Sequence, residues 1–497
     1  MTVSPVDYKD IQGIVRFGYH KLSEACFLLL KIRHAGAARA WLAEAPVSTA
    51  ETLSSPPETA LQVAFSAEGL RTLGVPQDIL GGFSPEFLAG MAGHESRSRR
   101  LGDVGANAPQ NWQWGGAGKT VDLVIMLYAQ PGRLQVWMEQ LQTATWKDAF
   151  EVLDCLTTSD LDGIEPFGFA DGISQPTIDW ERQLPTGKDR LSYENLASLG
   201  EFLLGYPNEY GRYTDRPLLD PAQPQAGLLP EAEDVPDKRD LGRNGSYLVF
   251  RHLQQDVRGF WRFLDAKTGS DPRAREALAE KMVGRKMNGD PLVSHSIAPI
   301  EGVDKADFVK NGFTYDADPR GTRCPFGAHI RRANPRNPDL PGHPEGLIAK
   351  LLRTLGFGAK AFRDDVEASA RFHRLLRRGR EYGPGLSPEQ AVADVPDTGE
   401  HGIHFICLAA NILRQFEFVQ NAWVMNTKFN ALTEESDPLL GNREKVTGNP
   451  VTDTFSVPKE NGLPERLTDL PQFVTVRGGG YFFLPSLSAL RYFSRLS

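Results

Sequence analysis

The stretch EPFGFADGISQP, residues 165–176, places an acid in an aromatic, glycine-containing turn. Asp171 lies between Gly168 and Gly172, and glycine permits tight turns and the close approach of a flat ligand. An aspartate in such a turn often only caps its own loop. The flanking phenylalanines favour a desolvated acid, whose pKa burial raises toward a value useful for proton transfer. We therefore predict that Asp171 is a pocket acid, with turn capping as the alternative.

A lone histidine follows a Pro-Phe-Gly turn in GTRCPFGAHIRRANPR, residues 321–336. His329 has no second histidine three or four positions away and no HExxH motif, which argues against zinc or two-histidine iron. A haem needs only one axial imidazole, and the neighbouring Arg331 could pair with a haem propionate. The alternatives are a structural histidine and a solvated basic loop.

Two later stretches could line the same site. In RFHRLLRRGREYGPG, Arg377 is expected at the end of an apolar-periodic helix, where the helix dipole alone favours a cation. In GIHFICLAANILRQFEFVQ, strand alternation places Ile403 and Phe405 on one face. Asn411 follows at the strand–helix junction, either as a polar group behind a cofactor ligand or as a helix cap.

Composition restricts the class of protein. The 497 residues carry a net charge of −8, which argues against a nucleic-acid partner. The four cysteines form no CxxC pair, so we expect reduced thiols, and without CxxCH no haem is attached covalently. The N-terminus does not resemble a secretory signal, and the apolar runs are too short to span a membrane, so we expect a cytoplasmic protein. The sequence leaves the oligomeric state open.

The order of apolar patterns predicts an α+β fold of two related halves with antiparallel sheets. A proline-rich connector at 205–244 would separate an N-terminal half, 1–204, from a C-terminal half, 245–497. The predicted strands are 25–32, 60–66, 121–130, 245–253 and 402–410, with a hairpin at 473–485. The predicted helices are 36–45, 133–146, 256–266 and 411–423, with charged helices over 347–380.

Several long strings together resemble the dye-decolourising peroxidases, a family of haem enzymes. The strings are FGFADGISQP, CPFGAHIRRANPR, HRLLRRGREYGPG, HFICLAANILRQFEFVQ and FVTVRGGGYFFLPSLSAL, and they occur between about residues 10 and 490. The resemblance implies two ferredoxin-like halves. It also implies non-covalent haem b in the C-terminal half, with one iron per chain.

The resemblance also implies roles for individual residues. His329 is similar to the proximal iron ligand, Asp171 to the distal acid–base and Arg377 to the distal arginine. Arg331 resembles a propionate contact. Ile173, Ser174, Ile403 and Phe405 would contact the haem.

Two positions depart from some branches of the family. Gly379 stands where those branches have an asparagine. Asn411 matches the acid that holds the proximal histidine, and a neutral partner there would raise the iron potential.

The implied activity is reduction of hydrogen peroxide coupled to one-electron oxidation of dyes, phenols or other aromatic reductants. Surface aromatics such as Trp261, Trp423 or Tyr315 would pass electrons from substrates too large to enter the pocket. The alternatives are a non-catalytic haem-handling protein, for which Asp171 and Arg377 have no purpose, and a structural protein without a cofactor.

Overall fold

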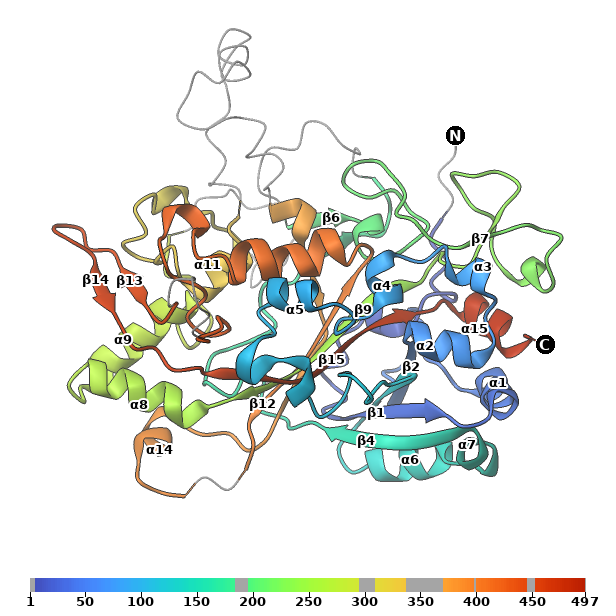
Figure 1. Cartoon of the computed structure of the whole chain (residues 1–497), viewed down its shortest axis with the longest axis horizontal. Coiled ribbons are helices and arrows are strands. Elements are labelled where there is room, and N and C mark those ends of the chain that lie inside the picture. Colours follow the sequence, from blue (N-terminus) through green and yellow to red (C-terminus); the bar gives the residue numbers. More distant parts are fainter. Residues whose placement is uncertain are drawn as a thin grey trace, which may run out of the picture.

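A single antiparallel sheet of nine strands crosses the molecule in the part of the chain that the structure describes (Figure 1). The computed structural model describes residues 5–183, 195–294, 309–336, 370–396, 399–444 and 452–496. Strand β1, Glu24–Ile32, is buried along almost its whole length. Cys26 and Leu28 pack into one core cluster, while Phe27 and Leu29 pack into another. Because both faces of the strand are covered, its sequence is a continuous apolar run.

The first half contributes four strands in the spatial order β2-β3-β1-β4. Helix α1 connects β1 to β2, and α6 with α7 connects β3 to β4, which is a β-α-β-β-α-β arrangement. The bounds are β2 Thr59–Phe65, β3 Leu123–Ala129, β4 Phe150–Thr157, α1 Ala35–Glu44, α6 Leu134–Leu141 and α7 Ala144–Ala149.

The second half repeats this order as β10-β12-β9-β15, with β11 also paired to β12. The bounds are β9 Ser246–Gln255, β10 Leu376–Arg377, β11 Arg380–Tyr382, β12 Gly402–Ala409, β15 Val474–Leu484, α8 Val257–Lys267 and α9 Pro272–Val283. The halves join where Phe483 of β15 pairs with Phe65 of β2. The predicted α+β fold with two ferredoxin-like halves is confirmed.

Shorter elements surround this sheet (Figure 1). The helices are α2 Ala67–Leu73, α3 Gln77–Leu80, α4 Pro85–Ala89, α5 Glu95–Leu101, α11 His329–Ala333, α14 Pro388–Val392 and α15 Leu487–Ser494. The strands are β5 Thr177–Asp179, β6 Leu196–Ser198, β7 Leu218–Leu219, β8 Arg239–Asp240, β13 Phe455–Val457 and β14 Glu465–Leu467.

The predicted hairpin at 473–485 is wrong, because these residues form the single strand β15. Its glycines serve close packing instead of a turn. A Cβ at Gly478 would lie 2.5 Å from the Trp114 indole nitrogen, and one at Gly479 would lie 2.8 Å from the Met91 sulfur. The run of glycines therefore makes room for side chains that arrive from the first half of the chain.

Three helix predictions also need correction. The helix expected over 133–146 is two helices, because Thr143 caps a new one at the Trp146 N–H. Residues 411–423 are mostly two π-helical segments, Leu413–Glu417 and Val419–Val424. Of the charged helices expected over 347–380, residues 347–369 lie outside the described part of the chain. Arg377 ends no helix but lies in strand β10.

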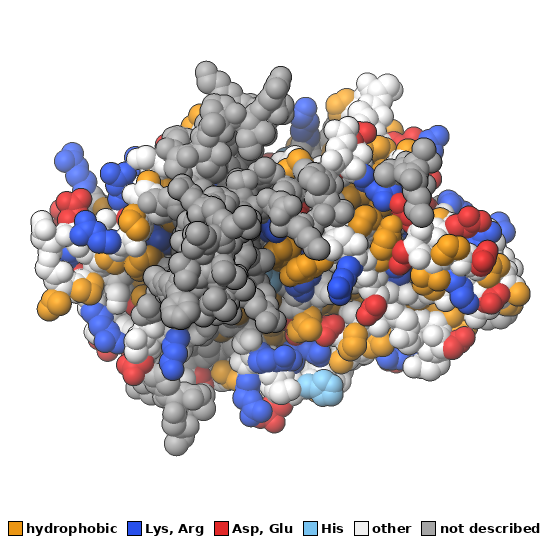
Figure 2. Space-filling model, turned by 90° about the horizontal axis from the view of Figure 1, so that it is seen from above, with side chains coloured by type: hydrophobic (Ala, Val, Ile, Leu, Met, Phe, Trp, Pro, Cys, Tyr) orange, Lys and Arg blue, Asp and Glu red, His pale blue; other side chains and the backbone are white. Residues whose placement is uncertain are grey.

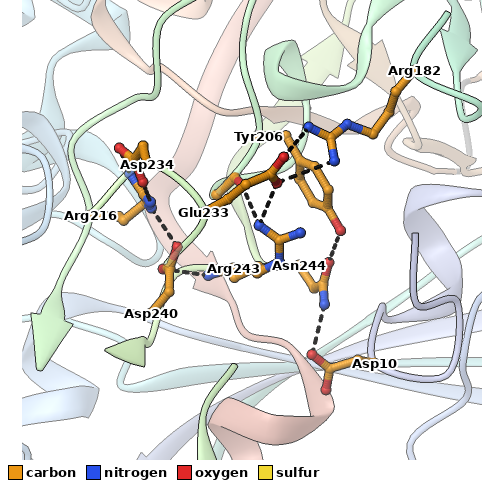
Figure 3. A network of polar contacts seen from close by, with 10 residues as sticks. Asp10, Arg182, Tyr206, Arg216, Glu233, Asp234, Asp240, Arg243 and Asn244 are labelled. Carbon is orange, nitrogen blue, oxygen red and sulfur yellow. Dashed lines mark hydrogen bonds and ion pairs between the residues drawn. The ribbon is translucent and has the colours of Figure 1, made fainter. Parts of the chain in front are cut away.

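Ion pairs and hydrogen bonds join residues within the connector, residues 205–244, and attach it to the body of the protein (Figure 3). The Arg216 guanidinium pairs with Asp234 and donates to Asp240 at 2.7 Å. The Asn244 amide donates to the Asp10 carboxylate at 2.8 Å, which ties the end of the connector to the N-terminal segment. The whole connector lies within the described part of the chain. The boundaries at 204 and 245 stay a prediction.

Charges of both signs are interspersed over the described part of the face in Figure 2. None of the helices that the structure describes is both long and apolar enough to cross a bilayer.

Candidate active site

A cavity of about 310 Å³ lies against one face of the second half of the sheet. Leu253 of β9 pairs with Ile403 of β12 and with Val476 of β15, and all three line the cavity. Phe405, two residues along β12, lines it as well. The predicted sharing of one face by Ile403 and Phe405 is therefore confirmed, because alternate residues of a strand point the same way.

His329 begins helix α11 and lines this cavity, with 27 % of its side chain exposed. Its Nδ1 lies 2.9 Å from Oδ2 of Asp437, a fully buried carboxylate. The other oxygen of Asp437 accepts the backbone N–H groups of Leu439 and Leu440, which fixes the orientation of the carboxylate. Nε2 is the ring nitrogen left for a metal, and Asp437 sets the tautomer.

Charge pairing decides the protonation of both groups. Burial alone lowers the pKa of His329, but the Asp437 carboxylate outweighs it and raises that pKa above its ordinary value. Burial raises the pKa of Asp437, but His329 and the backbone donors outweigh it and lower the pKa overall. Asp437 is therefore an anion behind the imidazole.

The prediction that Asn411 is the neutral partner of His329 is wrong, because Asp437 holds that position. The Asn411 side-chain oxygen accepts the Arg414 N–H at 2.8 Å, and its own N–H donates to the Gln415 side chain at 2.9 Å. This is the helix-capping alternative. Asp437 follows His329 by 108 residues in the chain, so no local motif connects the two.

Asp171 and Arg377 meet at the same cavity although 206 residues separate them in the chain. Arg377 Nη1 donates to Asp171 Oδ1 at 2.7 Å. About a third of each side chain is exposed, 32 % for Asp171 and 31 % for Arg377. Gly168 and Gly172 have φ values of +99° and +74°, which favour glycine and form the turn that presents the acid.

The pKa of Asp171 moves opposite to the sequence prediction. Burial raises it, as expected, but the Arg377 guanidinium and the Gly172 N–H outweigh burial, and His329 adds to their effect. The net pKa lies below the ordinary value for aspartate. Asp171 is thus a carboxylate ready to accept a proton.

The backbone of β10 positions Arg377. Its N–H donates to the Gln175 side chain at 3.0 Å, and β10 pairs Arg377 with Cys407 of β12. Gly379 follows, and a Cβ there would lie 2.5 Å from the His404 carbonyl oxygen. Close approach to β12 therefore excludes an asparagine at this position without a backbone shift.

Of the other predicted contacts, Ile173 and Ser174 line the cavity. Arg331 is not among the lining residues and is 1 % exposed. It lies two positions after His329 on α11, and residues so spaced do not share a helix face. Its guanidinium donates to the Cys324 carbonyl at 2.7 Å and pairs with Asp318 at 3.3 Å. The prediction that Arg331 contacts a propionate is not supported by this position.

Glu165 opens the first motif and lines the cavity, although its role was not predicted. Its carboxylate accepts the N–H groups of Phe167 and Phe169, both at 3.0 Å, and the Gln255 amide at 2.8 Å. Burial raises its pKa to about 7. Glu165 lies six residues before Asp171 in the same motif, and this proximity in the sequence could have indicated that it lies near the same site.

The aromatic residues expected at the surface are buried. Trp261, Trp423 and Tyr315 are 0 %, 5 % and 1 % exposed. They pack in apolar clusters of the described chain, so none of them offers a contact surface to a large substrate.

The donor set of the cavity fits a haem. It offers the His329 imidazole for iron, while the second lining histidine, His373, is hydrogen-bonded to the Arg414 carbonyl and stacked on Phe418. Apolar side chains suit a flat macrocycle, and Arg285 and Arg374 are available for carboxylates, whereas the lining Arg251 is paired with Asp103. Arg285 and Arg374 line the cavity and donate to backbone carbonyls. With the Asp171–Arg377 pair facing the same space, these features define a haem peroxidase site.

The comparisons with known proteins agree. No protein-family model matches the chain. It is 31 % identical to a dye-decolorizing peroxidase of Mycetinis scorodonius, over 97 % of this chain and 86 % of that protein. It is also 31 % identical to a multifunctional dye peroxidase of an Amycolatopsis species, over 87 % of this chain and 81 % of that protein.

The solved structure of a fungal DyP-type peroxidase from Auricularia auricula-judae is similar throughout. It matches with a TM-score of 0.73 at 25 % identity, covering 99 % of this chain and 100 % of that one. The chain belongs to the dye-decolorizing peroxidase family. It is a haem peroxidase, an enzyme that acts on hydrogen peroxide.

Proposed function

We propose that one non-covalent haem b binds in this cavity, where His329 would hold its iron. The absence of CxxCH from the sequence and the Asp437–His329 hydrogen bond support this assignment. Arg285 and Arg374, in place of Arg331, would hold the propionates, and Ile173, Ser174, Ile403 and Phe405 would contact the macrocycle. When bound, the haem supplies the iron that takes up the oxidising equivalents of peroxide.

Asp171 and Arg377 carry the proton and charge chemistry. The Asp171 carboxylate takes the proton from one peroxide oxygen and returns it to the other, so that water can leave. The Arg377 guanidinium stabilises negative charge on the departing oxygen. The ion pair between them keeps Asp171 ionised and holds its Oδ1 next to the Arg377 guanidinium before peroxide binds.

The reducing substrates are dyes, phenols or other small aromatic compounds, oxidised by one-electron steps. The names of the two curated relatives, both dye peroxidases, support this class.

The observation that carries the proposal is the Asp171–Arg377 pair at the cavity that contains His329. A haem carrier would need His329 but would gain nothing from a charge-paired acid that lines the same cavity.

The test is an absorption spectrum of the hemin-loaded protein before and after one equivalent of peroxide. The wild type should show a Soret band that shifts on addition of peroxide. Asp171→Asn should show the same band before peroxide is added, but the shift should be slower. His329→Ala should alter the band itself. A Soret band that peroxide leaves unchanged in the wild type would instead indicate haem carriage.

A further inference from the structure

Two of the four cysteines meet in the first half of the sheet, on strands β1 and β4. The sulfur atoms of Cys26 and Cys155 lie 2.7 Å apart, closer than unbonded sulfur atoms normally lie. Cys26 pairs with Thr157 and Cys155 pairs with Leu28 across the two strands, so the cysteines are diagonal neighbours on one face. A small movement brings the sulfurs to the bonding distance of about 2.05 Å.

The two thiols differ in exposure. Cys26 is fully buried in the core cluster beneath the sheet, whereas Cys155 is partly exposed. Strand β4 is the last strand of the sheet, and Val152 and Leu153 beside Cys155 are 44 % and 42 % exposed. A small oxidant can therefore reach Cys155 from solvent, whereas Cys26 has no exposed surface.

The more exposed thiol, Cys155, is also the more acidic of the two. A hydrogen bond from Cys26 lowers the pKa of Cys155 below that of an ordinary thiol, although burial opposes it. The same bond, together with burial, raises the pKa of Cys26. The more exposed sulfur is thus the better candidate for a thiolate, which is the nucleophilic form.

We propose that Cys155 and Cys26 are a peroxide-oxidisable dithiol, a second site of reaction with hydrogen peroxide that is separate from the haem cavity. The Cys155 thiolate attacks one peroxide oxygen, the O–O bond breaks, and the hydroxide that leaves takes up a proton to become water. The Cys26 thiol then attacks the resulting sulfenic sulfur, gives up its proton and releases a second water as the disulfide forms. Two thiols lose two electrons, and one peroxide gains them.

The bond would close a loop of 129 residues and join β1 to the last strand of the sheet. Such a cross-link restricts the unfolded chain, so the oxidised protein should melt on the order of 5 °C higher than the reduced protein. Strand β4 leads directly into the segment that carries Glu165 and Asp171. The cross-link would therefore anchor the start of that segment.

The experiment counts thiols in the holoenzyme after treatment with hydrogen peroxide and, separately, with diamide, which oxidises dithiols without haem chemistry. Starting from four thiols, the wild type should keep two, and dithiothreitol should restore four. Peptide mapping should find one linked pair that contains Cys26 and Cys155. Cys155→Ser should keep its three remaining thiols and lose the increase in melting temperature.

Cys324→Ser is the matched control, because it removes a buried thiol that belongs to a different apolar cluster from Cys26. It should still form the linked pair. Retention of all four thiols in the wild type under both oxidants would overturn the proposal. Oxidation of Cys155 to a sulfinic acid without a linked peptide would overturn it too, and the wild-type mapping decides the matter even if a variant does not fold.

Discussion

At the scale of the residue, we expect the Asp171–Arg377 pair to determine the pH at which peroxide reduction fails in acid. The guanidinium lowers the pKa of Asp171 against the effect of burial, so its loss should raise that pKa relative to the wild type. Because the carboxylate is the form that accepts a proton, activity falls when pH drops through this pKa. We therefore expect Arg377→Gln to move the acid limb of peroxide reduction to higher pH, measured by stopped-flow rates against pH.

Asp171→Asn is the reference for that measurement. It should slow peroxide reduction by about 10³-fold and abolish the part of the acid limb due to this group. An acid limb at the same pH in Arg377→Gln and the wild type would show that Asp171 does not control it.

Asp437 should control the iron through His329. An anion behind the imidazole strengthens its donation to the metal and lowers the iron potential. We expect Asp437→Asn to raise the ferric–ferrous midpoint potential and to weaken haem retention about tenfold or more. Asn411→Ala is the matched control, because Asn411 only caps a helix start, so the potential should be unchanged. The reverse pattern in redox titration would restore Asn411 as the partner.

At the scale of the element, Glu165 stabilises the segment that presents Asp171, because its carboxylate accepts hydrogen bonds from that segment and from Gln255 of β9. Its pKa of about 7 lies above the ordinary 4.5, so between these values the folded protein binds more protons than the unfolded chain. Stability due to Glu165 is therefore highest below pH 4.5 and falls as pH rises to 7, by roughly 3 kcal/mol. Glu165→Gln should remove this loss, and urea unfolding at pH 4.5 and 7 measures it. Equal pH dependence in both proteins would contradict the prediction.

The elements also show how far sequence patterns lead. β1 was predictable because burial on both faces leaves a continuous apolar run, and the turn of Asp171 because two glycines bracket it. The glycines around Gly478 suggest a turn in the sequence, whereas in the structure Gly478 allows the Trp114 indole to pack against strand β15. Sequence patterns do not reveal this contact between distant segments. Asp437 carried no signal, since its pairing with His329 depends on tertiary contacts between distant segments.

At the scale of the whole molecule, the two halves share one sheet and the two core clusters that cover its faces. The principal cluster contains Leu61 and Phe65 from the first half, and Tyr247 and Phe483 from the second. Each half has its own ferredoxin-like order, yet the apolar surface at their junction is buried only when both are folded. We therefore expect a single cooperative transition in calorimetry of the wild type.

Phe483→Ala should separate the two halves thermodynamically. The ring is fully buried at the β15–β2 junction and packs 4.8 Å from the Phe83 ring, centroid to centroid. Its loss should cost about 3–5 kcal/mol and split the calorimetric transition in two, because it removes packing on which both halves depend. Phe455→Ala, an equally buried ring on β13 in a cluster built mostly from the second half, should cost a similar amount without splitting the transition. Two transitions in the wild type would instead mean that residues 1–204 and 245–497 unfold as independent domains.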